Sequence, residues 1–128
     1  MVAVDTNVVI RLLTRDHPGQ ASRATELFAS EQIWISKTVL LESAWVLGSL
    51  YNFDASEVEN ALRGLAGLPN TQLEDVIAVA QAFDLCTRGV EIADALHLAS
   101  MGAAKTFATF DAKFAKRAQR AAMPVTSL

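Results

Sequence analysis

Short apolar runs alternate with longer amphipathic segments along the whole chain. We expect a β-strand in each of five short runs, at residues 1–4, 32–35, 71–74, 105–110 and 123–126. Helical spacing of apolar residues predicts helices over seven longer segments, at residues 8–13, 19–30, 38–50, 54–67, 75–85, 92–101 and 112–120. Thr38 is the expected N-cap of the third helix, and Asp54 or Ser56 that of the fourth.

This alternation predicts an α/β fold, in which helices cover both faces of a parallel sheet. Ligands of such sheets bind beyond the carboxyl ends of the strands. At 128 residues the chain has the length of one domain, so we expect residues 1–128 to form a single domain. Residues that directly follow the strands are therefore the first candidates for a functional site.

Composition excludes several classes of protein. About half of the residues are hydrophobic (52%) and 20% are charged, which supplies a core and excludes a disordered chain. No apolar run approaches the ~20 residues that cross a bilayer, and the N-terminus lacks a basic leader, so we expect no membrane span and no signal peptide. A single cysteine, Cys86, cannot form an internal disulfide, and we expect a cytoplasmic protein.

Four carboxylates lie in apolar surroundings near the expected strand ends. Asp5 ends the first strand, and Glu42 is the only charged residue of the helix 38–50. Asp94 lies in the first turn of a helix, and Asp111 directly follows the fourth strand. An ionised carboxylate among apolar residues is costly without a partner, so each of the four is expected to have one.

If these four side chains meet at one end of the sheet, their like charges raise each other's pKa values. A divalent cation with oxygen ligands removes this repulsion, and the sequence has no Cys/His cluster that would favour zinc. The net charge of the chain is −3, which the four carboxylates more than account for. We therefore expect Mg²⁺ or Mn²⁺ at this site.

The segments that carry these acids are VAVDTNVVIRLL, LLESAWVL, IADALHLA and ATFDAKF. Together and in this order they resemble the PIN-domain ribonucleases, and most of all the VapC-type toxins of bacterial toxin–antitoxin pairs. The resemblance implies a three-layer fold with a central parallel sheet of about five strands. It also implies Mg²⁺- or Mn²⁺-dependent endonucleolytic cleavage of RNA, often tRNA or rRNA, with Asp5, Glu42, Asp94 and Asp111 as catalytic metal ligands.

The same resemblance gives supporting roles to three polar residues. Thr6 and Asn7 match the pair that orients the first aspartate, and Thr109 matches the hydroxyl residue two before the last one. Residues 95–128 carry five basic side chains and one acidic one, so RNA contacts are expected near the last motif. The cations closest to the motifs are Arg11 and Lys113, and they are our candidates for contact with RNA phosphates.

Protein partners are expected as well. VapC-type toxins form homodimers, and a cognate VapB-type antitoxin covers their site. Apolar residues exceed what a small domain easily buries, which predicts a dimer surface or a groove for an antitoxin helix. The residues of this apolar excess include Val46, Leu47, Leu50, Leu62 and Leu65.

Three other interpretations remain open. The chain is alternatively a PIN nuclease of RNA maturation without an antitoxin, or a Mg²⁺-dependent phosphoacceptor or phosphatase domain. A phosphoacceptor needs paired acids after the first strand, where Asp5 stands alone, and a phosphatase needs a second aspartate where Asn7 stands. A non-catalytic binding module of the same fold is expected to lack some of the carboxylates, and this chain has all four.

Overall fold

The computed structural model describes all residues from 1 to 128, and their contacts divide the chain into two compact units. Unit 1 comprises Met1–Val76, and unit 2 comprises Ile77–Leu128. None of the helices combines the length and the hydrophobicity required to cross a bilayer.

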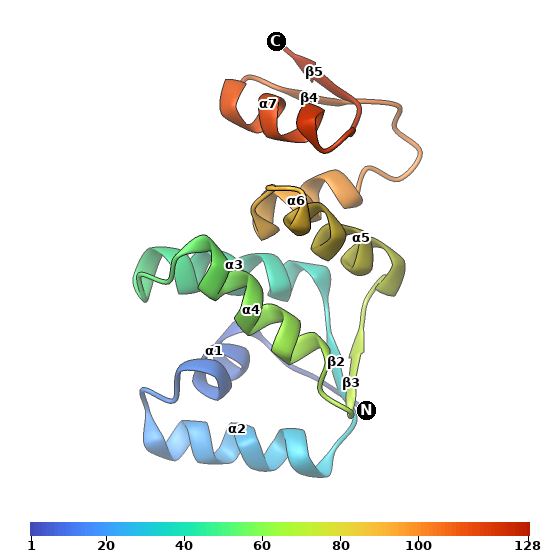
Figure 1. Cartoon of the computed structure of the whole chain (residues 1–128). Helices are drawn as coiled ribbons and strands as arrows, with labels where there is room; N and C mark the ends of the chain where they lie inside the picture. Colours follow the sequence, from blue (N-terminus) through green and yellow to red (C-terminus); the bar gives the residue numbers. More distant parts are fainter. The chain divides into compact units, whose positions relative to one another are not determined.

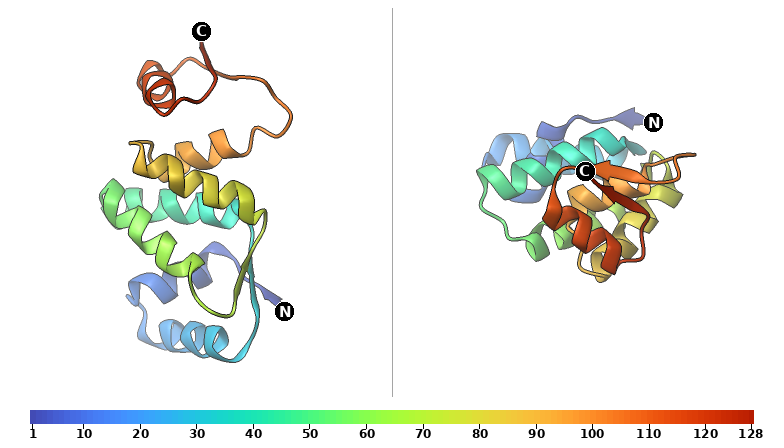
Figure 2. Two further views of the ribbon diagram at one scale, coloured as in Figure 1. Left: turned by 45° about the vertical axis from the view of Figure 1, so that its right-hand side comes forward. Right: turned by 90° about the horizontal axis from the view of Figure 1, so that it is seen from above.

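Unit 1 contains a three-stranded parallel sheet and four helices (Figures 1 and 2). Its elements are β1 (Val2–Ala3), α1 (Thr6–Thr14), α2 (Pro18–Ser30), β2 (Ile33–Ile35), α3 (Lys37–Leu50), α4 (Ala55–Ala66) and β3 (Thr71–Leu73). The strands lie in the order β1-β2-β3, and Ile33 pairs with Val2 on one side and with Thr71 on the other. Because the strands are parallel, the segments after β1 and β2 leave from the same edge of the sheet.

Side-chain caps start the helices that follow these strands. The carboxylate of Asp5 caps α1 directly after β1. The N-cap of α3 is Ser36 and not Thr38, because Ser36 follows β2 immediately and its hydroxyl accepts a hydrogen bond from the Val39 N–H. Asp54 caps α4, as one of the two expected alternatives, and forms a reciprocal capping box with Glu57.

The core of unit 1 corrects part of the expected apolar surface. Leu47, Leu62 and Leu65 are at most 1% exposed, so they are core residues and do not form a partner surface. The reason is helix periodicity: Leu62 and Leu65 lie three residues apart on one face of α4, which packs against α3. Leu50, by contrast, is 65% exposed at the end of α3.

Unit 2 combines three helices with a parallel pair of strands (Figures 1 and 2). Its elements are α5 (Val76–Thr87, of which Val76 belongs to unit 1), α6 (Ile92–Ala99), β4 (Phe107–Thr109), α7 (Ala112–Arg120) and β5 (Val125–Ser127). Helix α7 packs on both strands, and the rings of Phe107 and Phe114 lie 5.2 Å apart. Helix α6 ends two residues earlier than expected, because the Ser100 N–H turns back to the carbonyl of His97.

The α/β class with parallel strands is confirmed. Each of the five strands overlaps an expected segment; three belong to the sheet of unit 1 and two to the pair in unit 2. The seven helices also correspond to the seven expected segments.

Candidate active site

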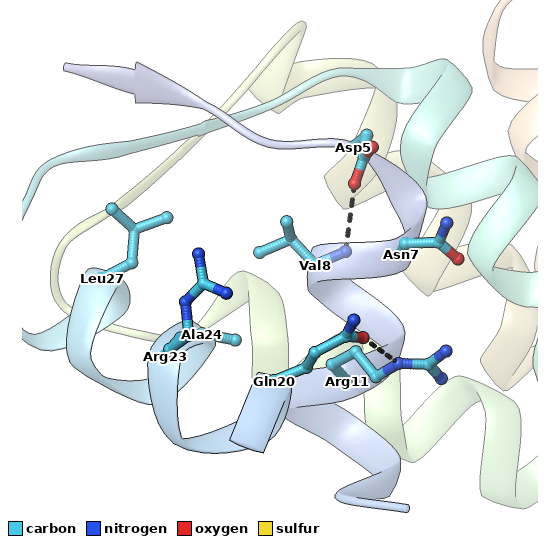
Figure 3. A pocket seen from close by; sticks show the side chains of 8 residues that line it. All are labelled: Asp5, Asn7, Val8, Arg11, Gln20, Arg23, Ala24 and Leu27. Atoms are coloured by element: carbon cyan, nitrogen blue, oxygen red, sulfur yellow. Dashed lines mark hydrogen bonds between the residues drawn. The ribbon is translucent and has the colours of Figure 1, made fainter. Parts of the chain in front are cut away.

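Unit 1 carries two of the four expected carboxylates, Asp5 and Glu42. Both side chains are exposed. Asp5 follows β1, and its Oδ1 accepts a hydrogen bond of 3.1 Å from the Val8 N–H, as Figure 3 shows. This bond fixes the side chain while Oδ2 stays open to a ligand. Glu42 lies in the second turn of α3 and forms no ion pair, so its carboxylate is open as well.

Unit 2 carries the other two, Asp94 and Asp111. Asp111 Oδ1 caps α7 by accepting hydrogen bonds of 3.0 Å from the N–H groups of Lys113 and Phe114. The Asp111 N–H in turn donates to Thr109 Oγ1 at 2.9 Å, so Thr109 fixes the backbone from which the carboxylate projects. Asp111 is therefore held as Asp5 is, with one oxygen on a helix start and the other open.

Asp94 lies in the first turn of α6 and is partly buried. Burial is the main reason why its pKa is raised above the usual value, and the negative charges of Glu91 and Asp111 raise this pKa further. The charge of His97, one turn later, opposes them. Asp111, from the same unit, is thus one of the charges that act on Asp94.

Thr6 and Asn7 do not hydrogen-bond to Asp5. Thr6 is buried in the first turn of α1, and Asn7 faces a pocket beside this helix. The orientation of Asp5 comes instead from its own cap bond to the Val8 N–H.

The donor chemistry of these residues fits a hard divalent cation. Each unit offers two carboxylates, and neither unit gathers three or more His, Cys, Asp or Glu side chains into a metal-binding cluster of its own. The open oxygens of Asp5, Glu42 and Asp111 are of the kind that Mg²⁺ and Mn²⁺ bind in combination with water. Asp94, whose charged form is destabilised by its surroundings, is the carboxylate that would gain most from a nearby cation.

A pocket of about 430 Å³ lies between α1 and α2, next to Asp5 (Figure 3). This volume falls within the range of roughly 300–1,000 Å³ that is typical of small-molecule sites. Apolar and polar side chains share its lining, which consists of Asp5, Asn7, Val8, Arg11, Gln20, Arg23, Ala24 and Leu27.

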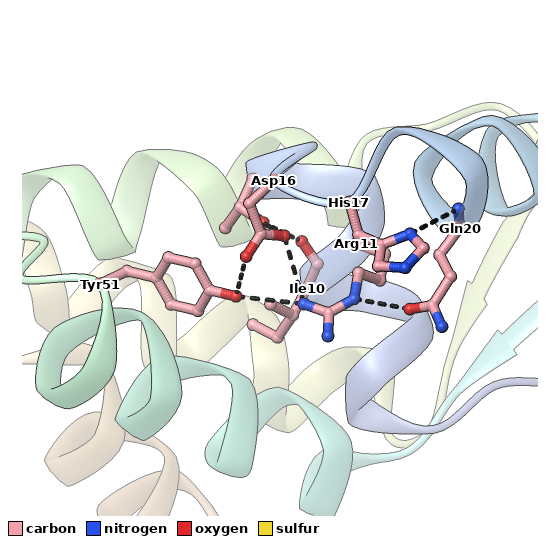
Figure 4. Close-up of polar contacts among 7 residues, drawn as sticks. Ile10, Arg11, Asp16, His17, Gln20 and Tyr51 are labelled. Atoms are coloured by element: carbon pink, nitrogen blue, oxygen red, sulfur yellow. Dashed lines mark hydrogen bonds and ion pairs between the residues drawn. The ribbon is translucent and has the colours of Figure 1, made fainter.

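Arg11, one of the two expected RNA contacts, is held by a network at the edge of this pocket (Figure 4). Its Nη1 donates to Asp16 and to the Tyr51 hydroxyl, both at 3.2 Å, and its Nε donates to Gln20 Oε1 at 2.7 Å. Tyr51 donates to the second oxygen of Asp16 at 2.7 Å. Most of the hydrogen-bonding capacity of Arg11 is therefore used within the protein. Lys113 is exposed and stays a candidate for RNA contact.

Arg23 is the pocket residue that sequence reasoning missed. It forms no hydrogen bond or ion pair, and Figure 3 shows its guanidinium reaching into the space between the two helices. The signal available in the sequence was spacing: Gln20, Arg23 and Leu27 fall on one side of α2, at the i, i+3, i+7 positions of a helical stripe.

Comparison with known proteins adds a family to this geometry. The model of the PIN domain family matches residues 2–119, a range that includes all four carboxylates. No individual curated protein matches the sequence significantly.

The hydrogen bonds to Asp16 predict how the stability of the fold depends on pH. The hydrogen bond from Tyr51 is the largest cause of the lowered pKa of Asp16, followed by the bond from Thr14, with the charge of Arg11 contributing less. A carboxylate whose pKa is lower in the folded state stabilises the fold above its unfolded pKa, and this stability is lost as the pH falls through the folded pKa. Tyr51→Phe should therefore raise the pKa of Asp16 and make unfolding less dependent on acid. NMR titration of the Asp16 carboxyl carbon and melting curves below about pH 4 measure both effects.

Thr25→Val serves as the control for that variant, because Thr25 also bonds an arginine, Arg15, but has no contact with Asp16. An Asp16 pKa that stays equally low in Tyr51→Phe would contradict the role given to the tyrosine.

A second prediction concerns Asp94. Because its pKa is raised in the folded state, Asp94 contributes stability below its unfolded pKa and loses that contribution as the pH rises through the folded pKa. Asp94→Asn should therefore melt at a higher temperature than the parent at pH 7 without divalent metal, and the difference should shrink in acid. Scanning calorimetry in chelator measures this. Asp84→Asn, which removes an exposed carboxylate paired with Arg88 in the same unit, should show no such gain; a gain of equal size there would count against the effect of burial.

Proposed function

Because the chain belongs to the PIN domain family, we propose that it is a Mg²⁺- or Mn²⁺-dependent endoribonuclease and the toxin of a VapBC toxin–antitoxin pair. Members of the family are generally metal-dependent nucleases, which gives the general class of this protein as a nuclease. The metal-dependent nuclease activity is supported by one observation: the family match spans four carboxylates, of which Asp5 and Asp111 are each fixed by a helix start with one oxygen left open. The toxin role rests on the resemblance of the four motif segments to VapC-type toxins.

In this proposal Asp5, Glu42, Asp94 and Asp111 hold the metal, and units 1 and 2 together form one nuclease domain over residues 1–128. A bound Mg²⁺ or Mn²⁺ would supply a water of lowered pKa and neutralise the negative charge that develops on the phosphate. The caps of α1 and α7 limit the motion of Asp5 and Asp111, so these ligands are preorganised. Thr109 adds to this by fixing the backbone of Asp111.

The proposed reaction is hydrolysis of an RNA phosphodiester. Water attacks phosphorus, the bond from phosphorus to the 3′ oxygen breaks, and that oxygen leaves and takes up a proton. The products are a 5′-phosphate and a 3′-hydroxyl. Since the 2′-hydroxyl takes no part, no 2′,3′-cyclic phosphate forms, and mapping the ends of the products distinguishes this reaction from attack by the 2′-hydroxyl.

Exposed apolar residues on α3 support a protein partner. Trp45 is 61% exposed and Leu50 is 65% exposed. Large apolar side chains on a helix surface are typical of subunit or peptide interfaces. We propose that these exposed side chains contact the second subunit of a homodimer or the VapB-type antitoxin, and that the protein acts in the cytoplasm, where tRNA and rRNA are found.

If all four carboxylates hold the metal, cleavage of RNA should require Asp5 from unit 1 as well as Asp94 from unit 2. Asp5→Asn in unit 1 and Asp94→Asn in unit 2 should each reduce RNA cleavage by more than about a hundredfold, because loss of a residue that merely supports a metal ligand already costs about 10–100-fold. Cleavage of total RNA with Mn²⁺, with and without chelator, measures this. Glu26→Gln, which removes an unpaired exposed carboxylate on α2, should cleave as the parent does. Normal cleavage by Asp5→Asn would refute the assignment.

The same variants should lose stabilisation by metal. Ligand at a hundredfold excess over its dissociation constant stabilises the parent fold by about 2.7 kcal/mol. Thermal melts of the parent and Glu26→Gln should shift upward with Mn²⁺, whereas those of Asp5→Asn and Asp94→Asn should not. If only the variants of one unit lost the shift, the metal site would belong to that unit alone.

The toxin role has a separate test in cells. Induced expression of the parent chain in a bacterial host should arrest growth, and expression of Asp5→Asn should not, because arrest requires cleavage of RNA. Growth that continues with an active, well-expressed parent would favour a nuclease of RNA maturation over a toxin.

A further inference from the structure

We propose that the pocket between α1 and α2 binds a nucleotide of the RNA substrate next to the scissile bond, with its phosphate on Arg23. This inference rests on the proposed nuclease function and deepens it, since it adds a substrate-binding site on one side of Asp5. The pocket lies wholly within unit 1 and includes Asp5 itself in its lining (Figure 3).

The charge of Arg23 has no partner in the fold. The side chain of Arg23 forms no ion pair and no hydrogen bond, and it lines the same pocket as Asp5. Its guanidinium points into the pocket from α2 (Figure 3). A planar, permanently charged group with all of its N–H donors unused fits a phosphate, which accepts two parallel hydrogen bonds from such a group.

The side-chain amide of Gln20 is oriented by a hydrogen bond from Arg11. Its Oε1 accepts the 2.7 Å hydrogen bond from Arg11 Nε, so the amide NH2 group (Nε2) remains available to a ligand in the pocket. Arg11 is itself held by Asp16 and Tyr51, so its bond favours this orientation of Gln20 (Figure 4). Arg11 thus positions the uncharged N–H donors of Gln20, while Arg23 supplies a positive charge that has no partner in the protein.

The lining of the pocket combines apolar and polar side chains. Val8, Ala24 and Leu27 give the pocket an apolar side, and the Gln20 amide supplies a polar group that can hydrogen-bond. A free phosphate would need only the donors, whereas a nucleotide also offers a ribose and a base that cover apolar surface and hydrogen-bond to an amide. The combination of free guanidinium, oriented donors and apolar wall matches a nucleotide better than an isolated anion.

The direct test uses adenosine 5′-monophosphate as the probe and needs no catalysis. In metal-free protein, titration with this nucleotide should shift the side-chain amide NMR signals of Asn7 and Gln20, and adenosine without the phosphate should shift them much less. The shifts should be lost in Arg23→Gln. Signals that do not move, or that move equally in Arg23→Gln, would overturn the proposal.

The second test measures cleavage of a fluorescent single-stranded RNA with Mn²⁺. Arg23→Gln should raise KM about tenfold, the loss expected for a charged hydrogen bond, with little change in kcat. It should also reduce the slope of log(kcat/KM) against log[salt] by about 0.7, the contribution of one phosphate contact in a single strand. Arg23→Lys, which keeps the charge, should recover part of the affinity.

Two further variants separate a specific pocket from a general effect of charge. Arg63→Gln removes the same charge from α4 and should leave KM within about twofold, since Arg63 lies outside the pocket and is paired with Glu59. Gln20→Glu keeps an acceptor for Arg11 but places a negative charge in the pocket, and it should raise KM as Arg23→Gln does. An equal rise of KM in Arg63→Gln would overturn the proposal in favour of general electrostatics.

The outcomes also separate this inference from the proposed function. If the nucleotide shifts Asn7 and Gln20 but no RNA is cleaved, the pocket stands and the nuclease assignment fails. If RNA is cleaved and Arg23→Gln has the KM and the salt slope of the parent, the nuclease assignment stands and the pocket proposal fails.

Discussion

A carboxylate that caps the helix after a parallel strand is the constraint on which the candidate site depends. Asp5 follows β1 and Asp111 follows β4, and each uses one oxygen to accept hydrogen bonds from the first turn of the next helix. The bond satisfies N–H groups that the helix cannot satisfy itself, so the residue contributes to the fold whether or not a ligand is present. Because only one oxygen is used, the same residue keeps a fixed and open ligand atom at the carboxyl end of the strand.

Asp94 differs from Asp5 and Asp111, because its carboxylate does not cap a helix. It caps nothing, and its surroundings disfavour its charge through burial and through the negative charges of Glu91 and Asp111. The positive charges of His97 and Arg117 oppose these effects only in part. A cation near this carboxylate would favour its charged form.

Much of the fold could be predicted from the sequence because strand and helix patterns are local, and the four carboxylates are candidates on equally local grounds. Strand and helix periods extend over a few residues, and Asp5 and Asp111 are conspicuous because apolar residues precede them. The features that were missed depend on contacts between distant residues. Leu62 and Leu65 count toward an apolar excess in the sequence, but only the packing of α4 on α3 shows that they are core residues. Arg11 is likewise a free cation until the fold brings Tyr51, 40 positions later, to its guanidinium.

Arg11 and Arg23 differ in whether the fold gives their charge a partner, and this difference is what distinguishes them as candidates for contact with a phosphate. An acidic site that must attract a polyanion needs positive charge nearby, and an arginine already paired with a carboxylate contributes little field of its own. Arg11 is close to Asp5 in the sequence but is neutralised by Asp16, so its main effect is to position Gln20. Arg23 lies 18 residues from Asp5 in the sequence yet lines the same pocket, and its charge has no partner within the protein. Whether an arginine is already paired in the fold, which its place in the sequence does not reveal, is therefore the reason for proposing Arg23 as the cation that receives a phosphate.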